Sequence, residues 1–439
     1  MGCDGNTCSD GNATPASPGV APGLDRGRDR PEAIDRARRI AERLAERFGE
    51  GGVDPRVPAV VPGFDGPFFQ AGLAGYSDAA MRIIARRHGC PMCVTEALLD
   101  RTLLAGGRGF AKADLGDIAN NVPGGDEDHP LCGQIMGSEP GEMAAGAVKM
   151  VEQGTRDAKS YRKMAVRHEG TEAVRHEAVP TVTASFATID VNLACPVKKI
   201  QRKARGGHWL AQPDGAIAIL QAVRDALPAE VPTTVKMRRS FDDTEDMRDA
   251  FYRIFDAAYD MGYAWVTVHG RTVRQRYVGP SRWDLLREIT QRAHPGRHRE
   301  RVVFGSGDVW NAEDVFFMLD YAGVQAASVA RGCIGNPWIF RQCRQMLAGD
   351  APAEPTIAEQ RAVLTEHFRL ALAENHQRRN AELATSKSMR KFGIQFSRHH
   401  PNAEAVRRRM IEVSSLADWH AVLDEHYTPV RSSPRRCRR

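Results

Sequence analysis

The 439-residue chain contains no stretch that approaches the roughly 20 consecutive apolar residues needed to cross a bilayer. Its N-terminus lacks a basic start followed by an apolar run, so we expect no secretion signal. It also fails the myristoylation pattern, because Asn6 stands where Ser or Thr is required. We therefore expect a cytoplasmic protein with no membrane partner.

The number and spacing of the cysteines also do not predict a disulfide framework. The nine cysteines are an odd number scattered over a long chain, so we expect them to be thiols. Cys90 and Cys93 have the spacing of half a zinc site or of a redox pair, but no second pair at zinc-like spacing follows. Two cysteines at the start of a strand are the simpler interpretation, and we expect no metal.

No G-x-G-x-x-G motif follows an expected strand, which argues against a Rossmann dinucleotide site. Hydrophobic residues make up 42% of the chain and charged residues 26%, as in soluble globular proteins. The formal charge of +6 permits nucleic-acid binding without requiring it. Basic residues cluster at 198–205, at 271–276 and in the tail 431–439, which is either a contact or a disordered end.

The chain divides by composition into four parts. Residues 1–60 read as a disordered leader followed by a short amphipathic helix over 31–48. Residues 61–348 alternate short apolar runs with helical ones, 349–428 are helical, and 429–439 form a basic tail. Residues 154–180 interrupt the alternation as a basic insertion, either a lid or RNA contact or a solvated charged helix.

Eight candidate strands fall within the second part, and eight strand-helix units predict a TIM (β/α)8 barrel followed by a small all-helical domain. The expected strands are Phe68–Ala71, Cys93–Glu96, Leu131–Met136, Thr188–Leu193, Thr233–Met237, Trp265–His269, Val302–Gly305 and Ala326–Ala330. For the helical part, Thr356 and Glu359 form a capping-box pattern, and three further helices are expected around 389–392, 406–413 and 416–426.

The barrel interpretation places the active site at the carboxyl ends of the strands. Ser306, Gly307 and Asp308 follow the seventh strand, and Ala330 and Arg331 follow the eighth, where barrels commonly bind phosphate. Gln134, Lys236 and His269 could face the polar edge of a ring system. Together these residues indicate a phosphorylated aromatic cofactor such as FMN.

Cys195 lies at the end of an apolar strand-like run and is followed by Lys198 and Lys199. A thiol at a strand end beside cations suggests chemistry on an anionic partner. The alternative is a buried cysteine that packs as a small hydrophobe.

At this point the sequence resembles the tRNA-dihydrouridine synthases, over about residues 68–427. The resemblance is carried by six motifs in the family's order: Ala71–Asp78, Val94–Glu96, Gly133–Pro140, Asp190–Lys203, Val266–Thr272, and Ala330–Gly332 with Gly335–Trp338. The family usually has Pro-Met where this chain has Gly72-Leu73, Asn at Ser306 and Gly at Ala194.

The resemblance implies an FMN-dependent, NADPH-driven reduction of uridine to 5,6-dihydrouridine in RNA, most commonly tRNA. Cys195 matches the family's catalytic cysteine, which gives a proton to carbon 5 of uracil as hydride passes from flavin to carbon 6. The implied cofactor contacts are Gly72, Leu73, Ala74, Gln134, Lys236, His269, Ser306, Gly307, Asp308, Ala330 and Arg331. Asn192, Lys198 and Arg271 match positions near the uracil, and Arg202, Lys203 and Arg205 are candidates for RNA phosphates.

Two other functions remain open from the sequence. One is an FMN barrel oxidoreductase that acts on a free pyrimidine or another small unsaturated substrate, and the other is an RNA-binding barrel without catalysis. The basic loop after Cys195 and the helical domain argue against the first, and the joint presence of Cys195, Lys236 and His269 argues against the second. No protein partner is evident, and we expect a monomer.

Overall fold

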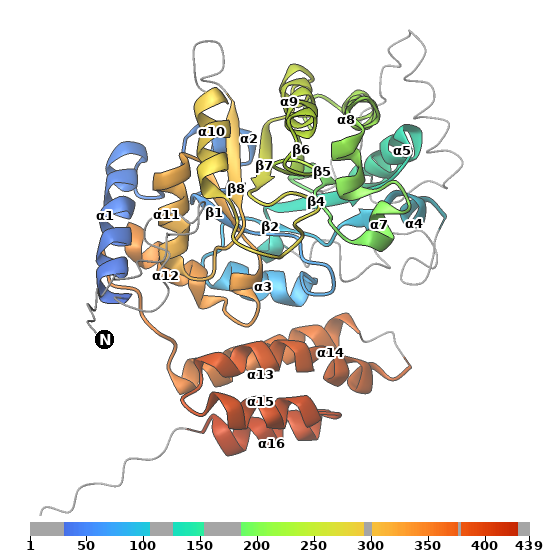
Figure 1. The fold of residues 1–439 in the computed structure, drawn as a ribbon. Coiled ribbons are helices and arrows are strands. Elements are labelled where there is room, and N and C mark those ends of the chain that lie inside the picture. Colours follow the sequence, from blue (N-terminus) through green and yellow to red (C-terminus); the bar gives the residue numbers. More distant parts are fainter. Residues whose placement is uncertain (1–29, 106–125, 153–185, 294–300, 376–378, 429–439) are drawn as a thin grey trace, which may run out of the picture.

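Parallel strands from the middle of the chain close into a barrel (Figure 1). This computed structural model describes residues 30–105, 126–152, 186–293, 301–375 and 379–428. Continuous apolar runs such as Val302–Ser306 are buried along their whole length, as parallel strands covered on both faces must be. The strands are β1 Phe68–Gln70, β2 Cys93–Val94, β3 Leu98–Leu99, β4 Leu131–Met136, β5 Thr188–Leu193, β6 Thr233–Arg238, β7 Trp265–His269, β8 Val302–Ser306 and β9 Ala326–Val329.

The barrel closes through a pairing between β2 and β4, and every strand pair is parallel. Eight strands form the ring, and the two-residue β3 extends the sheet by pairing Leu98 with Ile135 of β4. The sequence therefore predicted the barrel correctly. It missed β3 and made the second strand too long, because the chain leaves the sheet after Val94 and returns at Leu98.

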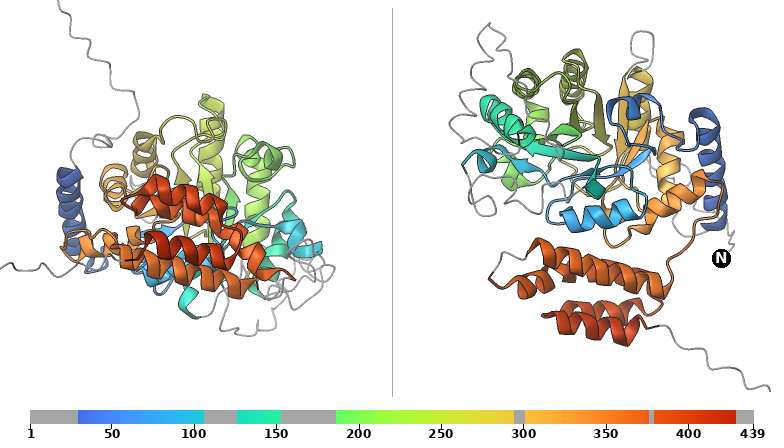
Figure 2. Two further views of the ribbon diagram at one scale, coloured as in Figure 1. Left: turned by 90° about the horizontal axis from the view of Figure 1, so that it is seen from below. Right: turned by 180° about the vertical axis from the view of Figure 1, so that it is seen from behind.

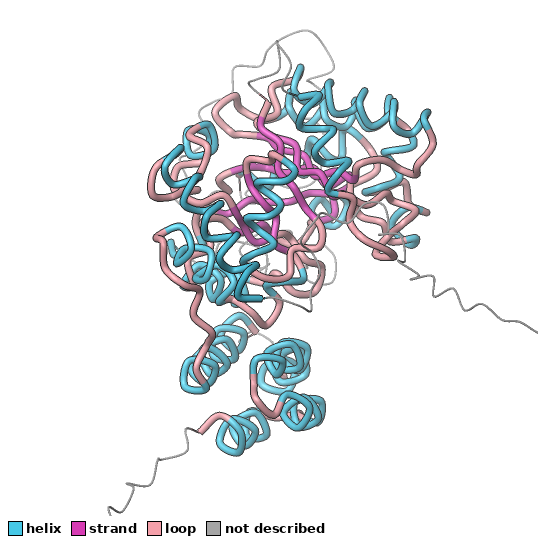
Figure 3. Tube along the Cα trace, turned by 60° about the vertical axis from the view of Figure 1, so that its left-hand side comes forward, coloured by secondary structure: helices cyan, strands magenta, loops and turns pink. Residues whose placement is uncertain are grey.

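Helices surround the sheet, as the ribbon and the tube both show (Figures 1 and 3). The helices that begin the chain or cover the barrel are α1 Arg30–Phe48, α2 Arg56–Val60, α3 Ala79–Arg87, α4 Asp100–Ala105, α5 Pro140–Val151, α7 Lys198–Gln201, α8 Pro213–Ala226, α9 Glu245–Asp260, α10 Trp283–Ala293, α11 Ala312–Ala322 and α12 Trp338–Leu347. The amphipathic helix expected over 31–48 is thus confirmed, and Ala37, Ile40 and Ala41 pack it onto the barrel.

The amino-terminal end of the barrel interior is filled with aromatic side chains. The ring of Phe64 meets those of Phe69 and Phe304 edge-on, with ring centres 5.8 Å apart in both pairs. The ring centres of Trp265 and Phe304 are 4.8 Å apart. These rings close that end, so the polar side chains of the strands are left to gather at the carboxyl end.

The C-terminal helices form a separate layer beside the barrel (Figures 1 and 2). They are α13 Ile357–Glu374, α14 Ala381–Phe396, α15 Ala403–Glu412 and α16 Leu416–His426. Thr356 caps α13 and Glu359 completes the capping box, as the sequence predicted. Phe368, Met389 and Trp419 are buried among these helices. The domain boundary near residue 349 remains a prediction.

Several sequence expectations fall outside the described residues: the leader before residue 30, the whole insertion 154–180, and the basic tail. Within the described part of the chain, none of the helices has the length and apolar character needed to span a membrane.

Candidate active site

A cavity of about 660 Å³ lies at the carboxyl ends of the strands. It brings together residues from eight different strand ends and loops that are far apart in the sequence. All eleven residues expected to contact a cofactor line it, together with the expected catalytic and substrate-contacting residues Asn192 and Cys195: Gly72, Leu73, Ala74, Gln134, Lys236, His269, Ser306, Gly307, Asp308, Ala330 and Arg331.

The backbone of Cys195 is held from two sides. The side-chain oxygen of Asn192 accepts hydrogen bonds from the backbone N–H groups of Ala194 (2.9 Å) and Cys195 (3.1 Å). On the other side, Arg238 Nε donates to the carbonyl of Ala194 at 3.0 Å. The thiol therefore sits on a fixed turn directly after β5.

The thiol of Cys195 is half-buried, and desolvation raises its pKa above the usual value, although the nearby backbone N–H of Val197 and the Arg238 guanidinium oppose this shift. The thiol thus keeps its proton at neutral pH. This protonation state suits a proton donor and does not suit a thiolate nucleophile.

A hydrogen-bond network links the cavity floor to this turn. Asn192 Nδ2 donates to Gln134 Oε1 at 2.7 Å, and Gln134 Nε2 donates to Asp190 at 2.8 Å. Thr234 donates to the other carboxylate oxygen of Asp190 at 2.7 Å. Burial raises the pKa of Asp190 to about 6, although these donors oppose the shift.

Lys236 brings a positive charge into the cavity from the middle of β6. Burial, assisted by the neighbouring Arg238, lowers its pKa to about 8, and the charge of Asp190 only partly offsets this. Its ammonium group makes no hydrogen bond or ion pair with any residue in the described part of the chain. A buried cation without a hydrogen-bond acceptor among the described residues is well suited to an anionic or polar ligand edge.

His269, at the end of β7, is neutral. Burial and then the surrounding cations Lys236 and Arg238 hold its pKa well below the usual value. Its Nδ1 accepts the backbone N–H of Arg271 at 3.1 Å, so its proton lies on Nε2. His269 can therefore donate a hydrogen bond from Nε2.

The turn after β8 adopts the left-handed conformation at Asp308, with φ 60°, and at Gly307, with φ 110°. The Asp308 carboxylate accepts two hydrogen bonds from Arg271, at 2.7 and 2.9 Å, and one from the backbone N–H of Ser281 at 2.8 Å. A longer ion pair of 3.5 Å joins it to Arg331. Asp308 thus orients two guanidinium groups.

Two aromatic residues that sequence reasoning missed also line the cavity. The Arg331 guanidinium lies 4.5 Å from the ring centre of Trp310 and 5.4 Å from that of Tyr277. Tyr277 is 56% exposed, which places it at the mouth. The only sequence signal for either ring was its position in a loop beside candidate phosphate-binding or basic residues.

The expected substrate-contacting residues separate into two groups. Lys198, Arg202 and Lys203 are exposed on α7 and the turn after it, close to Cys195 in the chain. Arg205 and Arg271 are instead buried and do not line the cavity. Arg205 pairs with Asp100 at 3.1 Å, and Arg271 pairs with Asp308 at 2.7 Å, so a role of either arginine near the substrate stays a prediction.

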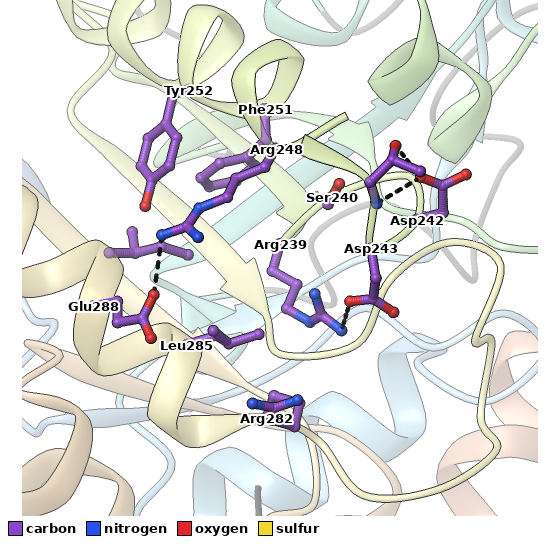
Figure 4. A pocket seen from close by; sticks show the side chains of 12 residues that line it. Arg239, Ser240, Asp242, Asp243, Arg248, Phe251, Tyr252, Arg282, Leu285 and Glu288 are labelled. Carbon is purple, nitrogen blue, oxygen red and sulfur yellow. Dashed lines mark hydrogen bonds and ion pairs between the residues drawn. The ribbon is translucent and has the colours of Figure 1, made fainter. Parts of the chain in front are cut away.

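A second, smaller cavity of about 210 Å³ lies between α9 and α10 (Figure 4). No residue expected at the site lines it. Its three arginines are each paired with a carboxylate: Arg239 with Asp243 at 2.7 Å, Arg248 with Glu288 at 3.1 Å, and Arg282 with Asp284 at 2.6 Å. Its charge is internally compensated, so the larger cavity is the stronger candidate site.

Among the described residues, no cluster of three His, Cys, Asp or Glu side chains could hold a metal.

The protein is an eight-stranded parallel barrel with one large cavity at the strand ends. A thiol, a lysine and an arginine-bearing turn surround this cavity, as in the active site of a barrel enzyme. Comparisons identify its family. A sequence profile of the dihydrouridine synthases matches residues 170–429. The probable tRNA-dihydrouridine synthase of Treponema pallidum is 29% identical over 363 residues, 82% of this chain and 92% of that protein. The tRNA-dihydrouridine synthase B of Shewanella oneidensis is 30% identical over 299 residues, 68% of this chain and 77% of that protein.

The chain therefore belongs to the dihydrouridine synthase family and is an oxidoreductase of that family. Among solved structures, an old yellow enzyme homologue from Zymomonas mobilis matches with a TM-score of 0.38 and 14% identity, over 62% of this chain and 86% of that one. That likeness is too weak to bear on function.

Proposed function

We propose that this protein reduces uridine to 5,6-dihydrouridine in tRNA, with FMN in the large cavity, NADPH as the electron donor and Cys195 as the proton donor. The observation that carries the proposal is the half-buried, protonated thiol of Cys195, which shares one cavity with Lys236 and the Arg331 turn.

The residues present fit FMN on three grounds. The cavity of about 660 Å³ lies within the roughly 300–1,000 Å³ typical of cofactor sites. Gly72 lines the cavity at a position where only glycine fits, because a Cβ there would come within 2.3 Å of the Thr95 carbonyl oxygen. Arg331 and the Ser306–Asp308 turn supply a cation and backbone donors at the end where barrels bind phosphate.

Gly72, Leu73 and Ala74 would lie under the ring, Gln134 and Lys236 at its polar edge, and His269 nearby. Ser306, Gly307, Ala330 and Arg331 would hold the phosphate, with Asp308 orienting Arg331. When bound, FMN would accept hydride from NADPH and deliver it to carbon 6 of the uracil.

The chain's own contribution to the reaction is a proton and its placement. Cys195 would give its proton to carbon 5 of the uracil, and the raised pKa of the thiol keeps that proton available at neutral pH. Asn192 would fix the turn that carries the thiol. The exposed cations Lys198, Arg202 and Lys203 would bind RNA phosphates, and the target uridine must leave its stack to enter the cavity.

The test is nucleoside mass spectrometry on unmodified tRNA and ribosomal RNA, each incubated with the protein, FMN and NADPH. Dihydrouridine in the tRNA pool alone is the expected result. Dihydrouridine only in ribosomal RNA would refute the tRNA assignment. NADPH oxidation by a yellow protein with no dihydrouridine in either pool would favour a small-molecule substrate.

A further inference from the structure

The helical domain lies beside the barrel (Figures 1 and 2), and its side chains contact two barrel segments next to residues that line the large cavity. Lys391 of α14 donates a hydrogen bond to the carbonyl of Gly75, and its ammonium lies 4.9 Å from the ring centre of Tyr76. Arg398, directly after α14, donates to the carbonyls of Gly332 (3.1 Å) and Ile334 (2.9 Å). These contacts follow Gly72–Ala74 in one segment and Ala330–Arg331 in the other.

The first segment, the loop from Leu73 to Ser77, is tightly hydrogen-bonded. The contact of Lys391 with this loop can therefore fix the backbone of Leu73 at the cavity. The backbone N–H of Leu73 donates to Ser77 Oγ at 2.9 Å, and the Leu73 carbonyl accepts from the N–H groups of Tyr76 (2.9 Å) and Ser77 (3.0 Å). Gly75 is the exposed tip of this loop. A shift of Gly75 therefore moves Leu73, which lines the cavity.

Further contacts from the helical domain fix the same region. The ring of Tyr76 meets Phe392 of α14 edge-on, with centres 5.6 Å apart. The end of α13 packs against α3, and Glu374 lies beside the capping residue Asp78, where burial raises the pKa of Glu374 to about 9. The loop and the helix that follows it are thus both held by the C-terminal helices.

The second segment lies close against α14. A Cβ at Gly335, whose φ is +64°, would come within 2.6 Å of the backbone nitrogen of Phe396, so only glycine allows this approach. Arg398 binds two carbonyls of the same turn. Arg331, the cation expected at the phosphate, is separated from Gly332 by a single peptide bond.

We propose that Lys391 and Arg398 are positioning residues through which the helical domain holds the two cavity-lining segments in the arrangement that binds the cofactor. The inference rests on the proposed function, since it takes FMN as that cofactor. The helical domain then completes the cofactor site in addition to any part it has in binding RNA. Neither residue lines the cavity, so each acts through the backbone it holds.

The experiment measures the dissociation constant of FMN for apoprotein of the full chain, by the change in flavin fluorescence on binding. We compare Lys391→Met and Arg398→Met with Lys387→Met and Arg408→Met, which remove the same charges from exposed positions in the same domain. Loss of each charge-assisted hydrogen bond is expected to weaken FMN binding about fivefold to tenfold. The controls are expected to match the wild type.

Lys391→Arg and Arg398→Lys keep a donor at each position and are expected to recover most of the affinity, while thermal melts show that every variant is folded. Wild-type affinity in both Met variants would overturn the positioning role and leave the proposed function intact. Failure of the wild type itself to bind FMN would overturn both.

Discussion

The side chain of Asn192 joins Gln134 to the backbone of Cys195. Its nitrogen donates to Gln134 Oε1 at 2.7 Å, and its oxygen accepts the N–H of Cys195 at 3.1 Å. One carboxamide thus ties the floor of the cavity to the turn that carries the thiol. The orientation of Gln134 and the position of Cys195 are therefore coupled.

Replacing Asn192 with Ala removes the acceptor for the N–H groups of Ala194 and Cys195. We expect kcat for dihydrouridine formation to fall about tenfold to a hundredfold, because a small misplacement of a reacting group costs that much. Flavin occupancy should change less, and Asn192→Asp, which keeps an oxygen acceptor, should recover part of kcat. Steady-state kinetics with tRNA check this, and a wild-type kcat in Asn192→Ala would contradict the coupling.

The pH dependence of the rate follows from the thiol. A general acid acts only while protonated, and burial raises the pKa of Cys195. The single-turnover rate of uridine reduction should therefore stay level from neutral pH through the usual thiol range and fall only as the pH rises through the raised pKa. A rate that increases over the same range would show that the thiolate is the active form.

The lowered pKa of Lys236 predicts a separate pH dependence of cofactor binding. Its pKa of about 8 means that the ammonium is charged below that pH and neutral above it. If this charge binds the cofactor, the dissociation constant of FMN for the apoprotein should increase as the pH rises through about 8. The Lys236→Met variant should bind FMN more weakly, with a dissociation constant that no longer depends on pH in this range. A pH-independent dissociation constant in the wild type would show that the Lys236 charge does not contact FMN.

The pair between Asp308 and Arg271 is expected to contribute to stability, because the Arg271 side chain is only 4% exposed and would lose its counter-charge, keeping only the Gly279 carbonyl as an acceptor. We expect Asp308→Ala to reduce the free energy of unfolding by about 3–5 kcal/mol. The matched control is Asp214→Ala, which breaks the exposed pair with Arg253 and should cost no more than about 1 kcal/mol. Urea unfolding of both variants measures the difference, and equal losses would contradict the argument.

The barrel could be predicted because its strands are continuous apolar runs, such as Val302–Ser306, separated by helical periodicity. The two-residue strand Leu98–Leu99 could not, since its pairing with β4 is too short to leave a pattern. The residues that line the cavity were predictable where they end a strand, as His269 and Ser306 do, or closely follow one, as Cys195 does.

The arginines show where sequence reasoning stops. Arg271 follows His269 by two residues, yet its side chain turns to Asp308, 37 positions later. Arg205 lies in the basic loop with Arg202 and Lys203, yet its side chain is buried and pairs with Asp100, 105 positions earlier. Such choices depend on partners that only the folded chain brings near. Tyr277 and Trp310 were missed for a related reason, because loop aromatics carry no periodicity.

The central claim is that Cys195 supplies the proton when uridine in tRNA is reduced. The most direct test reduces the protein's flavin with NADPH under anaerobic conditions, mixes it with unmodified tRNA, and follows flavin reoxidation and dihydrouridine formation together. In the wild type the two should proceed one for one, and in Cys195→Ala both should slow by about 10²–10⁴-fold while flavin reduction by NADPH is unchanged. Equal rates in Cys195→Ala, or wild-type reoxidation without dihydrouridine, would contradict the account.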